Sequence, residues 1–233
     1  MESGDVIKPL KLWHSVLLFM IPAFFGVGAH YVLAPYLVQT GVSQENAYNS
    51  ALLLVFVGLL LAVLWALRRE GRPLKWASMK ERLRLEPMTG KEWIWTLLFL
   101  FLYLLLSYGL GSLAGMVYGY LQFWPPDADV PLTNIPFAVV LLVLNVVSEE
   151  LWWRGYILPR QELQHGKYAW VVNGILWSFS HLFKWWAVPF LLLKQWMIPF
   201  IAQRLRNTTP CLIIHLVSNG MGILITLLPL VMN

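Results

Sequence analysis

The chain of 233 residues is 58% hydrophobic but only 12% charged, and it carries a net charge of +5. A soluble globular domain usually has about 25% charged residues, so a single water-soluble core could not bury this much apolar surface. The basic residues lie in short loops between apolar segments rather than on one face, and we therefore expect no nucleic-acid partner. The single cysteine, Cys211, excludes an intramolecular disulfide and a zinc site built from several thiolates.

Apolar runs recur along the whole chain, and a run of about 18 residues can cross a hydrocarbon core of about 30 Å as a helix. We expect spans at residues 13–37, 50–67, 93–121, 135–153, 168–183, 185–202 and 209–231. These segments lack the period-two alternation of outer-membrane β-strands. The predicted fold is therefore all-α, a polytopic integral membrane helical bundle of about seven spans. It is expected to form a single transmembrane domain over residues 1–233.

The charge distribution predicts the orientation in the membrane. Eight basic residues lie in the loop at residues 68–92: Arg68, Arg69, Arg72, Lys75, Lys80, Arg82, Arg84 and Lys91. The flanking connections at residues 39–49 and 122–134 contain neither Lys nor Arg, so by the positive-inside rule the basic loop and the N-terminus should be cytoplasmic. No signal-peptidase-like site follows the first apolar run. We therefore expect a retained first span and a multi-pass protein of the cell (plasma) membrane.

Two adjacent acids and one arginine occur at the end of the fourth predicted span. An ionisable side chain at the bilayer centre costs about 2.5–3.5 kcal/mol of insertion free energy. Such residues therefore usually have a structural or functional role. Adjacent side chains on a helix project about 100° apart, which gives Glu149 and Glu150 different surroundings. Glu150 and Arg154 have the i, i+4 spacing of an ion pair, whereas Glu149 lies on another face beneath Asn145. Glu149 is then expected to point into a cavity; alternatively, both acids are interfacial charges near a helix end.

Further polar residues occur in the fifth and seventh predicted spans. His181 shares a helical stripe with Trp177 and Asn173, and His215 shares one with Asn219. Taken singly, each could be a packing or interhelical hydrogen-bonding residue. Together with a glutamate, however, they supply a base, an orienting group and donors for an oxyanion. We therefore expect a polar site buried among the C-terminal helices.

Three motifs occur in order within residues 135–225: Glu149-Glu150-x-x-x-Arg154, an apolar helix with His181, and His215-x-x-x-Asn219. This pattern resembles the CAAX-protease and bacteriocin-processing family of intramembrane proteases, which includes the Rce1-type prenyl-protein endopeptidases. Residues 135–225 would then be the protease-like core, to which residues 13–134 add three spans and their loops. The resemblance implies an intramembrane endopeptidase that hydrolyses peptide bonds of membrane-associated or lipidated substrates.

The resemblance also implies a role for each motif residue. Glu149 would activate water, assisted by His181. His215 and Asn219 would stabilise the oxyanion of the tetrahedral intermediate. One departure is visible, since the second motif usually has Phe four residues before its histidine, where this chain has Trp177. The larger ring keeps the packing role but would reshape the pocket and with it the substrate preference.

Glu150 and Arg154 would hold the site together without taking part in the chemistry. The expected partners are a peptide or protein substrate presented from the membrane, with or without a prenyl group, and the lipid bilayer.

Members of this family have been described both as metalloproteases and as metal-free glutamate proteases. Glu149, His181 and His215 would be the ligands of a zinc site with one open position. The chain has no His-Glu-x-x-His motif, so the usual zinc-protease helix is absent from the sequence. We favour a reaction without a cofactor and keep zinc as the alternative.

Two other functions remain open at this point. The buried acids could form a proton or cation relay in a membrane transporter, although the two halves of the chain show no inverted-repeat symmetry. The same fold could also serve as a catalytically silent bacteriocin-immunity scaffold.

Overall fold

The computed structural model describes residues 7–125 and 134–232, and every regular element within these ranges is helical. The predicted all-α fold is confirmed. The elements before the gap are α1 (Leu12–Gly28), the π-helix η1 (Ala29–Leu33), α2 (Ala34–Gln39), α3 (Gln44–Arg69), α4 (Trp76–Arg82) and α5 (Gly90–Tyr120). Those after it are α6 (Ile135–Glu150), the π-helix η2 (Leu151–Ile157), α7 (Leu158–His165), the 3₁₀-helix η3 (Gly166–Tyr168), α8 (Ala169–Phe179), the 3₁₀-helix η4 (Leu182–Ala187), α9 (Val188–Lys194), α10 (Met197–Leu205) and α11 (Thr209–Met232).

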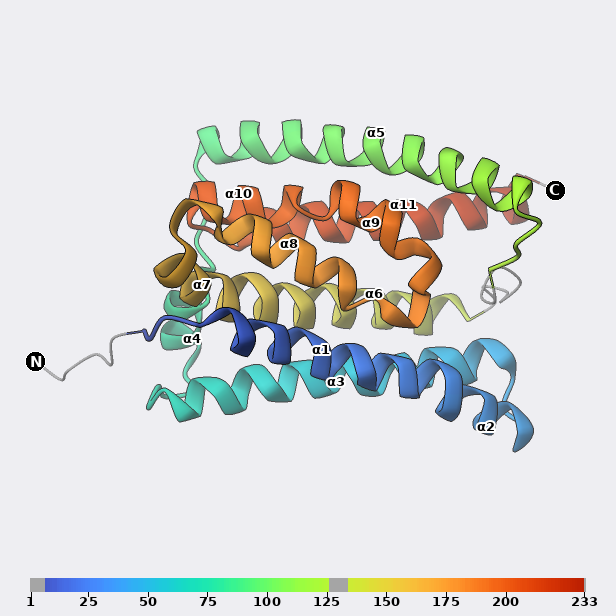
Figure 1. Ribbon diagram of the computed structural model, residues 1–233, viewed down its shortest axis with the longest axis horizontal. Helices are drawn as coiled ribbons and strands as arrows, with labels where there is room; N and C mark the ends of the chain where they lie inside the picture. The colour runs from blue at the N-terminus through green and yellow to red at the C-terminus, as the bar shows by residue number, and fades with distance from the viewer. Residues whose placement is uncertain (1–6, 126–133, 233) are drawn as a thin grey trace, which may run out of the picture.

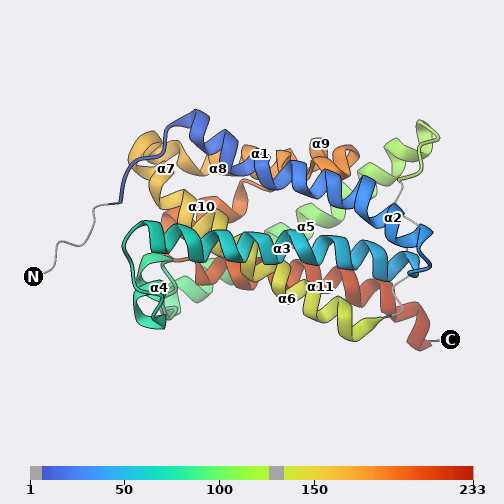
Figure 2. The same ribbon diagram turned by 90° about the horizontal axis from the view of Figure 1, so that it is seen from below.

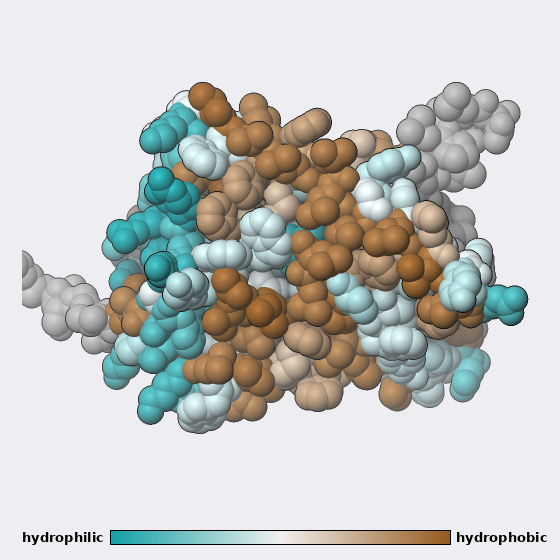
Figure 3. Space-filling view, turned by 45° about the horizontal axis from the view of Figure 1, so that its top comes forward, coloured by the Kyte–Doolittle hydropathy of each residue, from teal (hydrophilic) through white to brown (hydrophobic). Residues whose placement is uncertain are grey.

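The longest helices lie along one common direction, and α1 and α3 run side by side (Figures 1 and 2). Among the described residues, four helical runs are long and apolar enough to cross a membrane: Leu12–Gln39, Gln44–Arg69, Gly90–Tyr120 and Ile135–Phe179. A fifth is obtained if two bent helices are counted as one span. Figure 3 shows hydrophobic side chains across the middle of the visible face, with hydrophilic residues gathered at the end from which the N-terminus emerges. The protein is therefore integral to a membrane.

Two of the expected segments differ from the structure. The fifth predicted segment ends early, because α8 stops at Phe179 and His181 lies in the turn beyond it. The sixth is not one straight helix, since α9 and α10 meet at a 44° bend around Gln195. The fourth and fifth segments form one helical run that reverses direction at α7 (Figure 1). The number of seven spans stays a prediction.

The bend between α9 and α10 packs closely against α8 at a glycine. A Cβ added to Gly174 would lie 2.7 Å from the Cα of Trp196, so only glycine lets the two backbones approach this closely. Lys194 and Gln195 interrupt the apolar run at the bend, but the sequence pattern could not indicate the close approach to Gly174.

The basic loop is folded against the C-terminal helices. Arg82 is buried, forms an ion pair with Glu70 at 2.7 Å and donates to the carbonyl oxygen of Gly155 at 3.1 Å. Arg84 pairs with Glu162 through two hydrogen bonds of 2.8 Å. Two of the arginines that predict the orientation therefore also fasten α4 and its flanking loop to η2 and α7.

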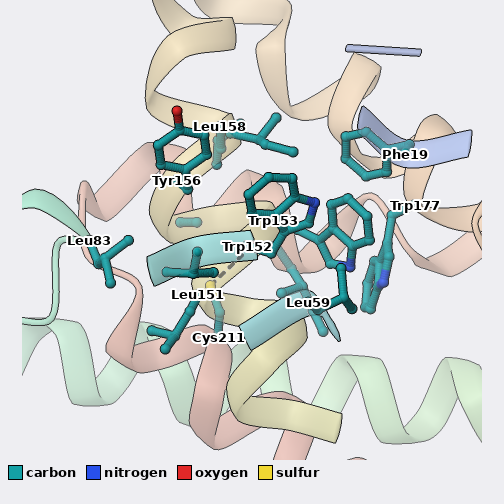
Figure 4. Close-up of a cluster of buried hydrophobic side chains, with 14 of the residues drawn as sticks. Phe19, Leu59, Leu83, Leu151, Trp152, Trp153, Tyr156, Leu158, Trp177 and Cys211 are labelled. Carbon is teal, nitrogen blue, oxygen red and sulfur yellow. Dashed lines mark hydrogen bonds between the residues drawn. The ribbon is translucent and has the colours of Figure 1, made fainter. Parts of the chain in front are cut away.

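The core around the end of α6 is aromatic and includes the first span. The ring of Phe19 on α1 stacks on that of Trp153 with centroids 4.1 Å apart, and Trp152 stacks on Tyr156 at 5.3 Å (Figure 4). Trp153 and Trp177 are among the largest side chains that are fully buried. Because α1 contributes to this core, the N-terminal spans help to enclose the region in which the polar motifs lie.

Candidate active site

Both glutamates are buried at the junction of α6 and η2. Glu149 is 8% exposed and Glu150 is fully buried, so they are not interfacial charges at a solvated helix end. The helix changes from α to π directly after Glu150. Short π-helical segments inside α-helices are frequent at functional sites.

Glu149 accepts one hydrogen bond on each carboxylate oxygen. The side-chain amide of Asn145 donates to Oε1 at 2.9 Å, and the indole N–H of Trp177 donates to Oε2 at 2.8 Å. The carboxylate is therefore held by one donor from its own helix and one from α8.

Glu150 lies in a separate polar group. Arg154 donates to its Oε1 at 3.1 Å, which confirms the expected i, i+4 ion pair. The ring of His215 on α11 meets the same oxygen, with Nδ1 at 2.7 Å. Because a carboxylate can only accept, His215 donates its Nδ1–H to Glu150. The second glutamate thus joins η2 to α11.

Arg154 is also in contact with Trp177. Its guanidinium carbon lies 3.5 Å from the centre of the indole ring, a cation–π contact in a fully buried place.

His181 lies just beyond α8, beside Glu149. Its Nδ1 is 2.9 Å from the carbonyl oxygen of Trp177, so Nδ1–H is the donor and a neutral ring keeps Nε2 as an acceptor. Glu149, His181 and Ser180 line a small cavity of about 20 Å³. His181 and Glu149 are therefore brought together, as the motifs predict.

His215 and Asn219 share one face of α11 but have different partners. Asn219 is exposed, and its amide donates to the side-chain oxygen of Asn145 at 3.1 Å. Asn145 in turn binds Glu149, so Asn219 is linked to Glu149 through one intervening amide.

The candidate metal ligands have the following partners in the structure. Within the described ranges, no group of three or more His, Cys, Asp or Glu side chains could hold a metal ion. The hydrogen bond from His215 to Glu150 uses Nδ1 and leaves Nε2 of the ring for another partner. Cys211 is buried, and its thiol donates to the Ile198 carbonyl oxygen at 3.4 Å.

The sequence could indicate one of the two hydrogen bonds to Glu149 but not the other. Asn145 precedes it by one helical turn, and this spacing does indicate contact. The indole donor of Trp177 comes from another helix, and no spacing rule relates residues across two helices.

Residues 131–221 match the model of a family described as type II CAAX prenyl endopeptidase Rce1-like. This segment is therefore similar to the Rce1-like family. The match includes all six motif residues and leaves the first three predicted spans outside it. No curated protein and no solved structure gave a match. The similarity to this family supports a CAAX-protease-like intramembrane endopeptidase, in agreement with the buried Glu149 and the half-buried His181 beside it.

Proposed function

We propose that the chain is an intramembrane endopeptidase that hydrolyses peptide bonds of membrane-associated or lipidated substrates. The observation that carries this proposal is the cavity of about 20 Å³ beside Glu149 and His181. A cavity of about 10–15 Å³ is enough for one water molecule when polar groups line it. A water molecule held there lies against a carboxylate and the acceptor nitrogen of an imidazole.

Glu149 is the general base in this proposal. The water oxygen attacks the scissile carbonyl carbon while a water proton passes to the Glu149 carboxylate, and the carbonyl oxygen becomes the oxyanion. The proton then moves to the leaving amide nitrogen as the carbon–nitrogen bond breaks. His181 orients the water through Nε2.

His215 and Asn219 are proposed to stabilise the oxyanion. Because Nδ1–H of His215 is engaged by Glu150, its donation to substrate has to come from Nε2, in a ring protonated at both nitrogens. Asn219 would exchange its bond to Asn145 for one to the substrate oxygen. Glu150 and Arg154 act by holding His215 in place.

An apolar pocket supports presentation of the substrate from the lipid. It measures about 910 Å³, lies between α1 and α3, and has exposed side chains such as Phe24 at its rim. Three of its lining residues, Pro22, Val55 and Leu59, also line the small cavity at Glu149. A peptide with or without a prenyl group would therefore reach the base from the membrane side.

We propose that the reaction needs no metal cofactor. The support is that Glu149 and His181, beside a water-sized cavity, supply a base and an orienting acceptor for water without a metal.

The test compares wild type with Glu149→Gln, which removes the proton acceptor but keeps the volume. Cells producing each form are compared for trimmed membrane peptides, and each pure protein in phosphatidylcholine vesicles is assayed with an internally quenched peptide ending in a farnesylated CAAX sequence. We expect Glu149→Gln to lose at least about 100-fold in kcat, a typical share of general-base catalysis. The control is Glu81→Gln, which changes a carboxylate that is 77% exposed and should keep wild-type activity. Full activity of Glu149→Gln would refute the proposed function.

A further inference from the structure

We propose that Trp177 is a positioning residue, whose indole N–H fixes the Glu149 carboxylate in the orientation that takes a proton from water. This inference rests on the proposed function and concerns the same site. Trp177 does not reach the substrate or the water itself in this proposal; it acts through Glu149.

The first observation is the short bond between the two side chains. Trp177 Nε1 lies 2.8 Å from Oε2 of Glu149, while Asn145 binds Oε1. With one donor on each oxygen, the carboxylate cannot turn about its terminal bond without breaking both hydrogen bonds. A carboxylate has about four lone-pair sites, so sites remain for the water in the cavity.

The second observation is that the indole ring is itself held from several sides. Arg154 lies over its face at 3.5 Å, and the ring of His215 meets it edge-on with centroids 5.4 Å apart. Nε and one terminal nitrogen of Arg154 have no hydrogen-bond partner among the described residues. A buried cation needs compensation, and the indole face supplies part of it.

Trp177 therefore contacts both polar groups of the site. Its N–H binds the first glutamate, and its ring face binds the arginine that pairs with the second. A phenylalanine at this position could stack on Arg154 but could not donate to Glu149. The N–H, rather than the ring, is the feature that bears on the reaction.

The kinetic test uses Trp177→Phe in the vesicle assay with the farnesylated CAAX peptide. Loss of one hydrogen bond to a buried carboxylate predicts a kcat lower by roughly 10- to 100-fold. KM should stay within about twofold of wild type, because Trp177 is 1% exposed and does not reach the substrate.

Trp152→Phe is the matched control. Trp152 is also buried, stacks on Tyr156, and donates its indole N–H to the Leu18 carbonyl oxygen at 3.5 Å. The substitution therefore removes the same volume and one N–H donor without touching either glutamate. We expect it to lower the melting temperature about as much as Trp177→Phe does, but to keep kcat near wild type. An equal fall of kcat in both variants would reduce Trp177 to a structural role and overturn the inference.

A spectroscopic test does not depend on activity or on the folding of Trp177→Phe. In ¹⁵N-tryptophan protein, the indole N–H signal of Trp177 should shift in Glu149→Gln and stay in place in Glu81→Gln. Absence of a shift in Glu149→Gln would overturn the inference. If Glu149→Gln is inactive but Trp177→Phe keeps full kcat, only this inference fails; if Glu149→Gln is fully active, the proposed function fails as well.

Discussion

Glu149 and Glu150 are neighbours in the sequence, but their carboxylates have no hydrogen-bond partner in common. Glu149 is bound by two uncharged N–H donors, whereas Glu150 is bound by a guanidinium and an imidazole. The two residues are of the same type, so it is their surroundings that give them different roles. Glu149 lies beside a water-sized cavity, whereas Glu150 holds helices together.

This difference predicts that the two glutamates contribute unequally to the free energy of unfolding. Glu150→Gln should destabilise the fold by about 3–5 kcal/mol, because it leaves the fully buried Arg154 without its charge partner. Glu149→Gln should cost much less, since a glutamine oxygen can still accept one of the two N–H donors. Thermal unfolding in detergent measures both, and equal melting temperatures for the two variants would contradict the prediction.

At the scale of the elements, the sequence predicts contacts within one helix better than contacts between helices. The i, i+4 spacing gives the Glu150–Arg154 pair and the position of Asn145 beneath Glu149, because both depend only on helical geometry. The bonds from His215 to Glu150 and from Trp177 to Glu149 depend on how α11 and α8 pack against α6. No periodicity encodes that packing.

The close packing of α8 against the bend after α9 is a second feature that spacing within one helix cannot show. Gly174→Ala should destabilise the protein by about 1–3 kcal/mol, as expected for overpacking, because the new methyl group would meet the Trp196 backbone. The control is Gly115→Ala on α5, where an added Cβ meets nothing within 4 Å. Thermal unfolding of the two variants provides the comparison, and a Gly174→Ala protein as stable as Gly115→Ala would argue against the close approach of α8 and the bend.

At the scale of the whole molecule, several basic segments gather at one end. The end of α3, α4 and α7 lie together there, while the turn between α2 and α3 lies at the opposite end (Figure 1). The two loops that the predicted orientation places on opposite sides of the membrane, at residues 68–92 and 39–49, therefore lie at opposite ends of the bundle (Figure 1). The orientation itself, with the basic end in the cytoplasm, stays a prediction.

Cysteine labelling measures the orientation with two equivalent substitutions. Ser78→Cys lies on α4 at the basic end, and Ser43→Cys lies before α3 at the other end. The only native cysteine is fully buried, so background labelling should be low. On intact cells, an impermeant maleimide should label Ser43→Cys and spare Ser78→Cys. The reverse pattern would mean that the protein is inserted the other way round.

The packing of α1 on the C-terminal core has a consequence for biosynthesis. The indole N–H of Trp152 reaches the carbonyl oxygen of Leu18 across 134 residues of sequence, and Phe19 stacks on the adjacent Trp153. Contacts between residues so distant in the chain form late, after the intervening polypeptide has been synthesised. Since α1 is synthesised long before α6 and η2, its contacts with Trp152 and Trp153 can form only after those later segments have emerged. Assembly of the site is thus a post-insertional event, in which helices already resident in the membrane exchange lipid contacts for one another.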